Sequence, residues 1–197
     1  MAPRVEDHAI IDSPRDSITA LPPITLILGG TRSGKSAHAE SLITRGIGVH
    51  WNDALYIATA QIGDAEMAVR IHNHQARRGA NWTTIEEPLA LARTLRKEIS
   101  ARRPALVDCL TLWLTNIMLS DHDPYKEEAE LIGSLAELAG PVVFVSNEVG
   151  LGIVPDNALA RAFRDHAGRL NQHIAAAAQR VEFIAAGLPV TLKNEYP

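Results

Sequence analysis

Residues 24–36 read Ile-Thr-Leu-Ile-Leu-Gly-Gly-Thr-Arg-Ser-Gly-Lys-Ser, and this stretch decides the fold. The apolar, partly β-branched run at its start is typical of a buried parallel strand. The remainder fits Gly-x-x-x-x-Gly-Lys-Ser, a pattern in which small residues let backbone N–H groups surround phosphate oxygens. In that pattern Lys35 reaches the β- and γ-phosphates, and the hydroxyl of Ser36 is a ligand for Mg²⁺. We therefore predict a phosphate-binding loop (P-loop) between a strand and a helix. Arg32 is either a solvated side chain or a further group that holds phosphate, and we favour the second.

Apolar runs alternate with helical stretches along the rest of the chain. Further strands are predicted at residues 54–60, 105–110 and 141–147, with a terminal strand or hairpin at 181–186 and 189–192. Helices are predicted over residues 36–45, 64–78, 89–100, 112–119, 127–138 and 157–180. Repeated crossovers of this kind give a mostly parallel sheet with helices on both faces. The expected fold class is therefore α/β, a P-loop NTPase of the RecA-like type.

The length and composition favour one soluble domain. We interpret residues 24–197 as a single P-loop α/β domain and residues 1–23, which are charged and contain no apolar signal region, as a flexible N-terminal extension. No apolar run is long enough to span a bilayer. The net charge of −4 gives no overall attraction for nucleic acid, and the single cysteine, Cys109, agrees with a reducing compartment. We expect a cytoplasmic protein with no nucleic-acid partner and no stable membrane insertion.

An acid, Asp108, closes the predicted strand at 105–110. We expect this strand to lie beside the P-loop strand, where P-loop enzymes keep the carboxylate that holds Mg²⁺ through water. The alternative is an aspartate that caps the helix that follows. Both interpretations remain open at the level of sequence.

Two histidines, His72 and His74, lie two residues apart in the predicted helix at 64–78. They point about 200° away from each other on a helix, so they are not expected to share a metal. His74 falls on the inward-facing stripe, and this pattern alone favours a partly buried histidine with a satisfied hydrogen bond. The alternative is a nucleophile on phosphorus, because neutral imidazole is a good nucleophile near pH 7 and Arg77 and Arg78 follow.

Two other segments are candidates for substrate contacts. Glu86 follows Trp82-Thr83-Thr84-Ile85 and either accepts hydrogen bonds from a base or ribose or is an exposed charge. Residues 147–155 read Asn-Glu-Val-Gly-Leu-Gly-Ile-Val-Pro, which suits a substrate-binding loop after a strand or a plain strand-to-helix connection.

Taken together, the P-loop, the block at residues 66–86 and the block at 147–172 resemble a family of cobalamin biosynthesis. It is the bifunctional adenosylcobinamide kinase/adenosylcobinamide-phosphate guanylyltransferase family. The resemblance runs from about residue 24 to residue 193, and the Asn-Glu-Val-Gly-x-Gly-Ile-Val-Pro run is specific to it, whereas a P-loop is shared by many enzymes. Two departures are Asp108, where some members carry Glu, and residues 1–23, which have no counterpart.

The resemblance implies two reactions. ATP or GTP first phosphorylates the aminopropanol hydroxyl of adenosylcobinamide, and GMP is then transferred from GTP to that phosphate to give adenosylcobinamide-GDP. It places a covalent guanylyl intermediate on His74, which reverses the preference that the helical pattern gave. It also implies a homotrimer, and the P-loop pattern with its strand-end acid gives Mg²⁺ as the expected cofactor, held by Ser36 and Asp108. The implied nucleotide contacts are Gly29, Gly30, Thr31, Arg32, Ser33, Gly34, Lys35, Ser36, Ala58, Thr59, Ala60, Gln75, Ala76, Arg77, Arg78, Glu86 and Asp108.

Two other functions compete with this interpretation. One is a plain P-loop kinase for a small metabolite, in which His74 is structural and no nucleotidyl transfer occurs. The other is a nucleotide-dependent switch or binding module, which the short chain without an added interaction domain disfavours.

Overall fold

The computed structural model describes residues 21–60 and 80–196. Its strands are β1 (Ile24–Gly29), β2 (Ala54–Ala58), β3 (Trp82–Glu86), β4 (Ala105–Asp108), β5 (Val142–Asn147), β6 (Arg180–Ala185) and β7 (Leu188–Asn194). Its helices are α1 (Lys35–Thr44), α3 (Leu91–Glu98), α4 (Leu110–Met118), α5 (Pro124–Ser134) and α6 (Ala158–Ala177), with a 3₁₀ turn at Leu135–Glu137.

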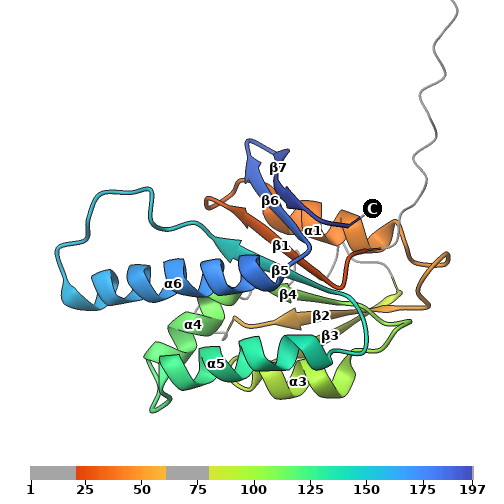
Figure 1. The fold of residues 1–197 in the computed structure, drawn as a ribbon, viewed down its shortest axis with the longest axis horizontal. Helices are drawn as coiled ribbons and strands as arrows, with labels where there is room; N and C mark the ends of the chain where they lie inside the picture. Colours follow the sequence, from red (N-terminus) through yellow and green to blue (C-terminus); the bar gives the residue numbers. More distant parts are fainter. Residues whose placement is uncertain (1–20, 61–79, 197) are drawn as a thin grey trace, which may run out of the picture.

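These strands form one sheet in the order β3-β2-β4-β5-β1-β6-β7. All neighbouring strands are parallel except β6 and β7, which form an antiparallel hairpin at one edge. Helix α1 covers one face of the sheet, and α3, α4, α5 and α6 cover the other (Figure 1). The predicted class, a RecA-like P-loop α/β fold with a mostly parallel sheet, is confirmed.

The core is divided by the sheet into two layers. Val143 and Val145 of β5 pack toward α1, whereas Val142 and Phe144 of the same strand pack toward the helices of the opposite face. Both sets are fully buried, as expected for a central strand covered on both sides. The uninterrupted apolar run at residues 142–145 follows directly from this double burial.

The strand β3 was missed from the sequence. It lies at the sheet edge, and none of its residues is fully buried, so no continuous apolar run marks it. The other predicted strands, and the predicted helices near residues 36–45, 89–100, 112–119, 127–138 and 157–180, are confirmed with small shifts at their ends. The helix predicted at 64–78 lies outside the described residues.

The expected position of the Asp108 strand was wrong. We predicted that it lies beside the P-loop strand, but β5 separates β4 from β1. Apolar periodicity identifies strands without giving their order, because a crossover connection can skip a place in the sheet. Asp108 and the P-loop nevertheless share the carboxyl edge, because β1, β5 and β4 run parallel.

None of the helices in the described ranges is long and apolar enough to cross a membrane.

Replacing Leu106, which is fully buried in β4, with alanine should lower the free energy of unfolding by about 2–5 kcal/mol, since it leaves a cavity in a packed core. The matched control is Leu192→Ala on the edge strand β7, where the side chain is 60% exposed and a change under about 0.5 kcal/mol is expected. Denaturant unfolding of both variants measures the difference. Equal losses would contradict the core assignment.

Candidate active site

The P-loop joins the end of β1 to the first turn of α1. Ser33 N–H donates to the carbonyl of Gly30 at 3.2 Å, which closes the loop on itself. Gly34 stands at the N-cap of α1 with φ of 97°, a left-handed conformation that glycine adopts without strain. The loop therefore leads directly into the N-terminus of α1, a position that favours a bound anion.

Lys35 lies folded back over this loop. Its side chain is only 8% exposed, and its Nζ donates to the carbonyl of Gly30 at 2.9 Å. Burial lowers the pKa of Lys35, and the thiol of Cys109 and the carboxylate of Asp108 act in the opposite direction. The ammonium group is thus held at the phosphate-binding loop rather than in solvent.

Asp108 ends β4 on the same edge of the sheet. Its Oδ2 accepts a hydrogen bond from the hydroxyl of Tyr56 at 2.8 Å. The N-cap of α4 is Cys109, and no side chain caps that helix, so the alternative of Asp108 as a helix cap is wrong. The carboxylate of Asp108 and the hydroxyl of Ser36 offer oxygen atoms, the type of ligand that Mg²⁺ prefers. In the described ranges no group of three or more His, Cys, Asp or Glu side chains gathers into a site suited to another metal.

The ends of three neighbouring strands, β3, β2 and β4, are aligned at the edge where Asp108 lies. Ala58 at the end of β2 pairs in register with Asp108 on one side and with Glu86 of β3 on the other. Parallel register therefore brings Ala58, Glu86 and Asp108 to one edge, as the implied nucleotide contacts require. Glu86 is exposed there.

The segment after β2 is fixed by a buried threonine. The hydroxyl of Thr59, fully buried, donates to the carbonyl of Cys109 at 2.7 Å and accepts from its N–H at 2.8 Å. The amide of Asn116 on α4 donates to the carbonyl of Thr59 at 2.7 Å. These contacts bind residues 58–60 to the start of α4 and hold both beside Asp108.

The implied contacts fall into two groups on one edge. The first group, residues 29–36, runs from the end of β1 through the loop to the first turn of α1. The second lies at or just after the ends of β2, β3 and β4 and consists of Ala58, Thr59, Ala60, Glu86 and Asp108. The end of β5 lies between them, with Asn147 in register with Gly29. Several residues named from the sequence lie outside the described residues: His72 and the implied site residues His74, Gln75, Ala76, Arg77 and Arg78.

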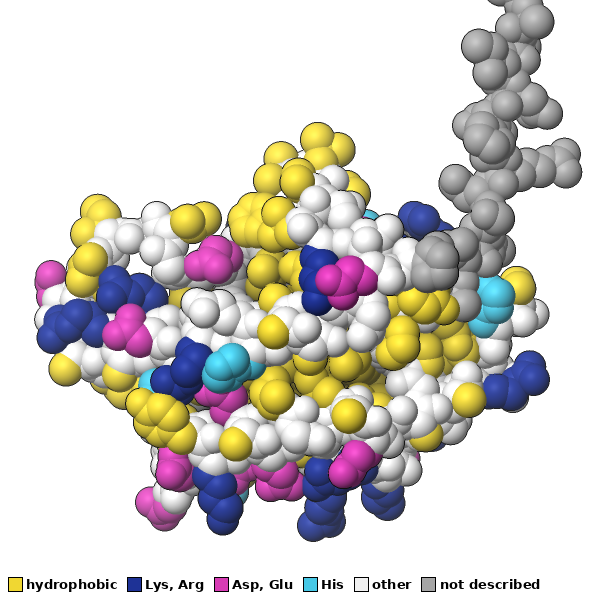
Figure 2. Space-filling view, in the orientation of Figure 1, with side chains coloured by type: hydrophobic (Ala, Val, Ile, Leu, Met, Phe, Trp, Pro, Cys, Tyr) yellow, Lys and Arg dark blue, Asp and Glu magenta, His cyan; other side chains and the backbone are white. Residues whose placement is uncertain are grey.

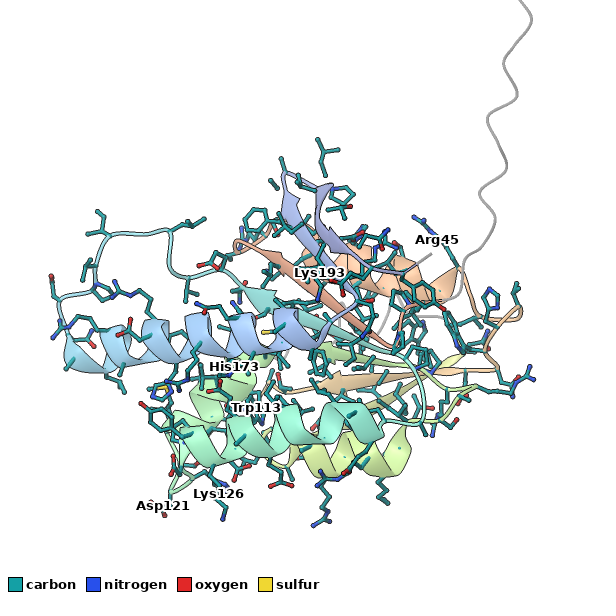
Figure 3. All side chains as sticks on the ribbon, viewed as in Figure 1. Arg45, Trp113, Asp121, Lys126, His173 and Lys193 are labelled. Carbon is teal, nitrogen blue, oxygen red and sulfur yellow. The ribbon has the colours of Figure 1, made fainter. Side chains whose placement is uncertain are left out.

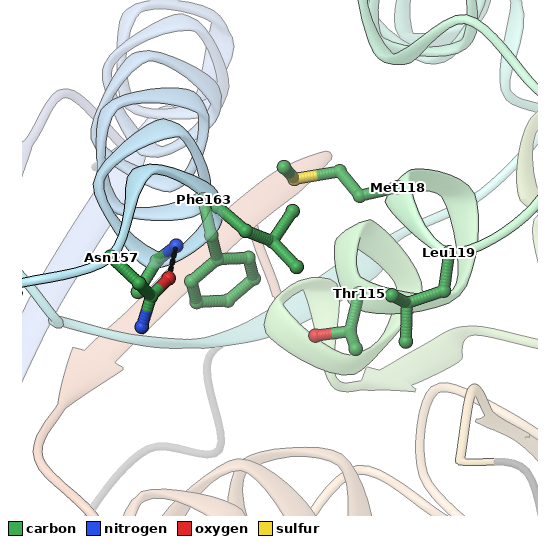
Figure 4. Close-up of a pocket in the computed structure, with 7 residues that line it drawn as sticks. Thr115, Met118, Leu119, Asn157 and Phe163 are labelled. Atoms are coloured by element: carbon green, nitrogen blue, oxygen red, sulfur yellow. Dashed lines mark hydrogen bonds between the residues drawn. The ribbon is translucent and has the colours of Figure 1, made fainter.

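A mostly apolar cavity of about 360 Å³ opens between α4 and α6 (Figure 4). It is lined by Thr115, Met118, Leu119, Asn157, Leu159, Ala160 and Phe163. The neighbouring loop after β5 exposes Leu151, Ile153 and Val154, and hydrophobic side chains are visible over this loop in Figure 2. Concave apolar surfaces of this size are typical of small-molecule sites.

Comparison with known proteins agrees with this geometry. Residues 25–192 match the family model described as cobinamide kinase / cobinamide phosphate guanyltransferase. The chain belongs to this family. It is 55% identical to the bifunctional adenosylcobalamin biosynthesis protein CobP of Pseudomonas aeruginosa over 174 residues, 86% of this chain and 97% of that one. It is 40% identical to the bifunctional adenosylcobalamin biosynthesis protein CobU of Escherichia coli, over 85% of this chain and 98% of that one.

Among solved structures, the flagellar accessory protein FlaH from Methanocaldococcus jannaschii has a TM-score of 0.52 at 12% sequence identity. That alignment covers 87% of this chain and 78% of FlaH. At this identity the likeness concerns the fold alone, and it agrees with the RecA-like arrangement of the sheet. Membership in the cobinamide kinase / cobinamide phosphate guanyltransferase family rests on the sequence matches.

Sequence reasoning missed two residues that support the site of this family member. Tyr56 and Asn116 each make one of the contacts that hold the edge near Asp108 and Thr59. Tyr56 reads as one apolar residue of a buried strand, and Asn116 as one polar residue of an apolar helix. Tyr56 and Asp108 are 52 positions apart and Asn116 and Thr59 are 57 apart, so no local pattern could have identified these two contacts.

Cys109, the only cysteine, should be unreactive in the native enzyme. Burial and the charge of Asp108 raise the pKa of its thiol to about 11, which leaves almost no thiolate near neutral pH. A thiol reagent that reports by absorbance should label the native protein at least about a hundredfold more slowly than the protein unfolded in denaturant. Equal rates would contradict the buried position of Cys109.

Proposed function

We propose that this protein phosphorylates adenosylcobinamide with ATP or GTP and then transfers GMP from GTP to the product, giving adenosylcobinamide-GDP. The observation that carries the proposal is the buried Lys35 at the P-loop, which shares an edge of the sheet with Asp108 and Glu86. Family membership supplies the identity of the acceptor.

In the kinase step, the hydroxyl oxygen of the acceptor attacks the γ-phosphorus. The bond from that phosphorus to the β–γ bridging oxygen breaks, a nucleoside diphosphate leaves, and the hydroxyl proton passes to solvent. Backbone N–H groups of residues 30–36 hold the phosphates, and Lys35 neutralises the charge that grows on the bridging oxygen. Ser36, and Asp108 through water, would hold Mg²⁺, which would supply neutralisation of the negative charge on the phosphates.

In the guanylyl step, an imidazole nitrogen of His74 attacks the α-phosphorus of GTP, and pyrophosphate leaves. A phosphate oxygen of the phosphorylated acceptor then attacks the same phosphorus and breaks the phosphorus–nitrogen bond. Free histidine is restored, and the product carries GDP. The guanine nucleotide is assigned to a set of binding residues outside the P-loop, namely Ala58, Thr59, Ala60, Gln75, Ala76, Arg77, Arg78 and Glu86.

We further propose that the enzyme acts in the cytoplasm as a homotrimer, as the family resemblance implies. The main competing function is a plain kinase without nucleotidyl transfer, in which His74 has only a structural role.

Asp108→Asn should raise the Mg²⁺ concentration needed for half-maximal kinase rate by about tenfold, because an amide is a weaker partner for the hydrated cation than a carboxylate. Kinase rates measured across a Mg²⁺ titration give this value. The control is Asp121→Asn, an exposed acid in the turn before α5 (Figure 3), which should leave the titration unchanged. An unchanged Mg²⁺ requirement in the Asp108 variant would contradict its role at the metal.

His74→Ala should abolish covalent labelling by GTP that carries the label on its α-phosphate, because the nucleophile is missing. Phosphorylation of adenosylcobinamide should persist at a measurable rate, since direct γ-phosphoryl transfer needs no imidazole. Labelled protein is detected after denaturation in base, in which a phosphoramidate survives, and the two products are separated by chromatography.

The matched control is His72→Ala, which should retain both reactions. Labelling that persists in the His74 variant but disappears in the His72 variant would place the intermediate on the other histidine. If the His74 variant loses both reactions and also melts at a lower temperature, His74 has a structural role. A wild-type protein that phosphorylates the acceptor and never takes up label would support the plain kinase.

A further inference from the structure

A buried carboxylate lies beside the P-loop helix and is not used by the chemistry described above. Glu182 of β6 is 1% exposed, and both of its oxygens have partners. Oε2 lies 2.5 Å from Nε2 of His38 on α1, and Oε1 accepts from Nε of Arg180 at 2.7 Å. A second guanidinium nitrogen of Arg180 also contacts Oε1. The three side chains therefore join the P-loop helix to the neighbouring strand.

The electrostatics of this cluster keep Glu182 charged. Burial alone would raise the pKa of Glu182, but the hydrogen bond from His38 and the charge and hydrogen bonds of Arg180 outweigh burial and hold the pKa below its usual range. A buried anion is stable only while its partners stay in place, because an unpaired one costs several kcal/mol. The position of His38 relative to β6 is therefore strongly fixed.

His38 is one helical turn from the phosphate-binding end of α1. Its backbone N–H donates to the carbonyl of Gly34 at 3.0 Å, and Lys35 and Ser36 lie between these two residues. The helix has no side-chain cap at Gly34 and no acidic residue in its first turn. The first turn of α1 thus lacks the local groups that usually fasten a helix start, and the contact to Glu182 takes that place.

The same hairpin touches the loop itself. The N–H of Gly187, in the turn between β6 and β7, donates to the carbonyl of Ser33 at 2.8 Å. A Cβ atom at Gly34 would lie 3.3 Å from the Cα of Gly187, so the two backbones are in close contact. The β6–β7 hairpin therefore holds the nucleotide-binding segment at two levels, at the loop and one turn into the helix.

We propose that Glu182 and His38 are positioning residues for nucleotide binding: their contact holds the start of α1 so that the N–H groups of residues 30–36 and the side chain of Lys35 converge on the phosphates. Neither side chain is assigned a contact with the nucleotide. The inference rests on the proposed function, because it takes the P-loop to bind nucleotide.

The chain contains a matched control for this idea. Glu128 of α5 is 5% exposed, and its carboxylate also pairs with one arginine and one histidine, Arg169 at 3.2 Å and His173 at 2.7 Å. This second cluster joins α5 to α6, where His173 lies between the two helices in Figure 3. It has the same chemistry as the Glu182 cluster but no contact with the P-loop among the described residues.

The experiment compares Glu182→Gln with Glu128→Gln. Both variants lose a buried charge, and both should melt at a lower temperature than the wild type. Affinity for GDP with Mg²⁺, measured by calorimetry well below each melting temperature, should fall about tenfold or more in Glu182→Gln and change less than about twofold in Glu128→Gln. The kinase reaction of Glu182→Gln should show a matching rise in KM for the nucleotide.

Two histidine variants give a second test that does not depend on Glu182→Gln being folded. His38→Ala should weaken GDP binding as Glu182→Gln does, whereas His38→Gln, whose amide can still donate to the carboxylate, should recover most of the affinity. Equal melting losses with wild-type GDP affinity in Glu182→Gln and His38→Ala would overturn the inference. Lys35→Ala is the reference: if it binds GDP as tightly as the wild type, the nucleotide site itself is misassigned and the proposed function fails separately.

Discussion

The ammonium group of Lys35 is nearly buried at the carboxyl edge of the sheet. Burying a charge costs free energy, and the neighbouring groups of the candidate site offset that cost. The carbonyl of Gly30 accepts its hydrogen bond, and the carboxylate of Asp108 lies close enough to offset part of the desolvation. Strand β5 separates the two parent strands, so the sheet order fixes the spacing between cation and acid. A nucleotide's phosphates would meet a charge that is already desolvated and positioned, which increases its effect in a region of low dielectric.

Short-range signals in the sequence were sufficient for the loop and most of the elements. The P-loop pattern, the apolar runs of β1, β2, β4 and β5 and the length of α6 are each visible within a window of about twenty residues. The strand order is not visible in any such window, because an apolar run carries no information on which other strand it pairs with. As a consequence, Asp108 was predicted one strand too close to the P-loop strand. β3 was missed since an edge strand with exposed positions lacks the pattern of a buried one.

The groups that support the site were harder to predict for the same reason. His38 and Glu182 are 144 positions apart, and Tyr56 and Asp108 are 52 apart. A histidine in a helix and a glutamate in a strand each read as ordinary polar residues until the fold brings them together. The two buried glutamates, Glu182 and Glu128, have the same kind of surroundings. In each, an arginine and a histidine pair with the negative charge of the carboxylate between two packed elements.

The position of β1 in the sheet also affects how the chain must fold. Both strands that flank β1, namely β5 and β6, come from the second half of the chain, and the turn that touches Ser33 is at Gly187. During synthesis β1 is made before both of its neighbours, since β5 begins at Val142 and β6 at Arg180. Contacts of such large sequence separation form slowly, because the intervening chain must be ordered first. The nascent protein therefore carries an apolar, unpaired β1 until β5 and β6 have been made, and the P-loop gains its contact with Gly187 only after β6 has docked.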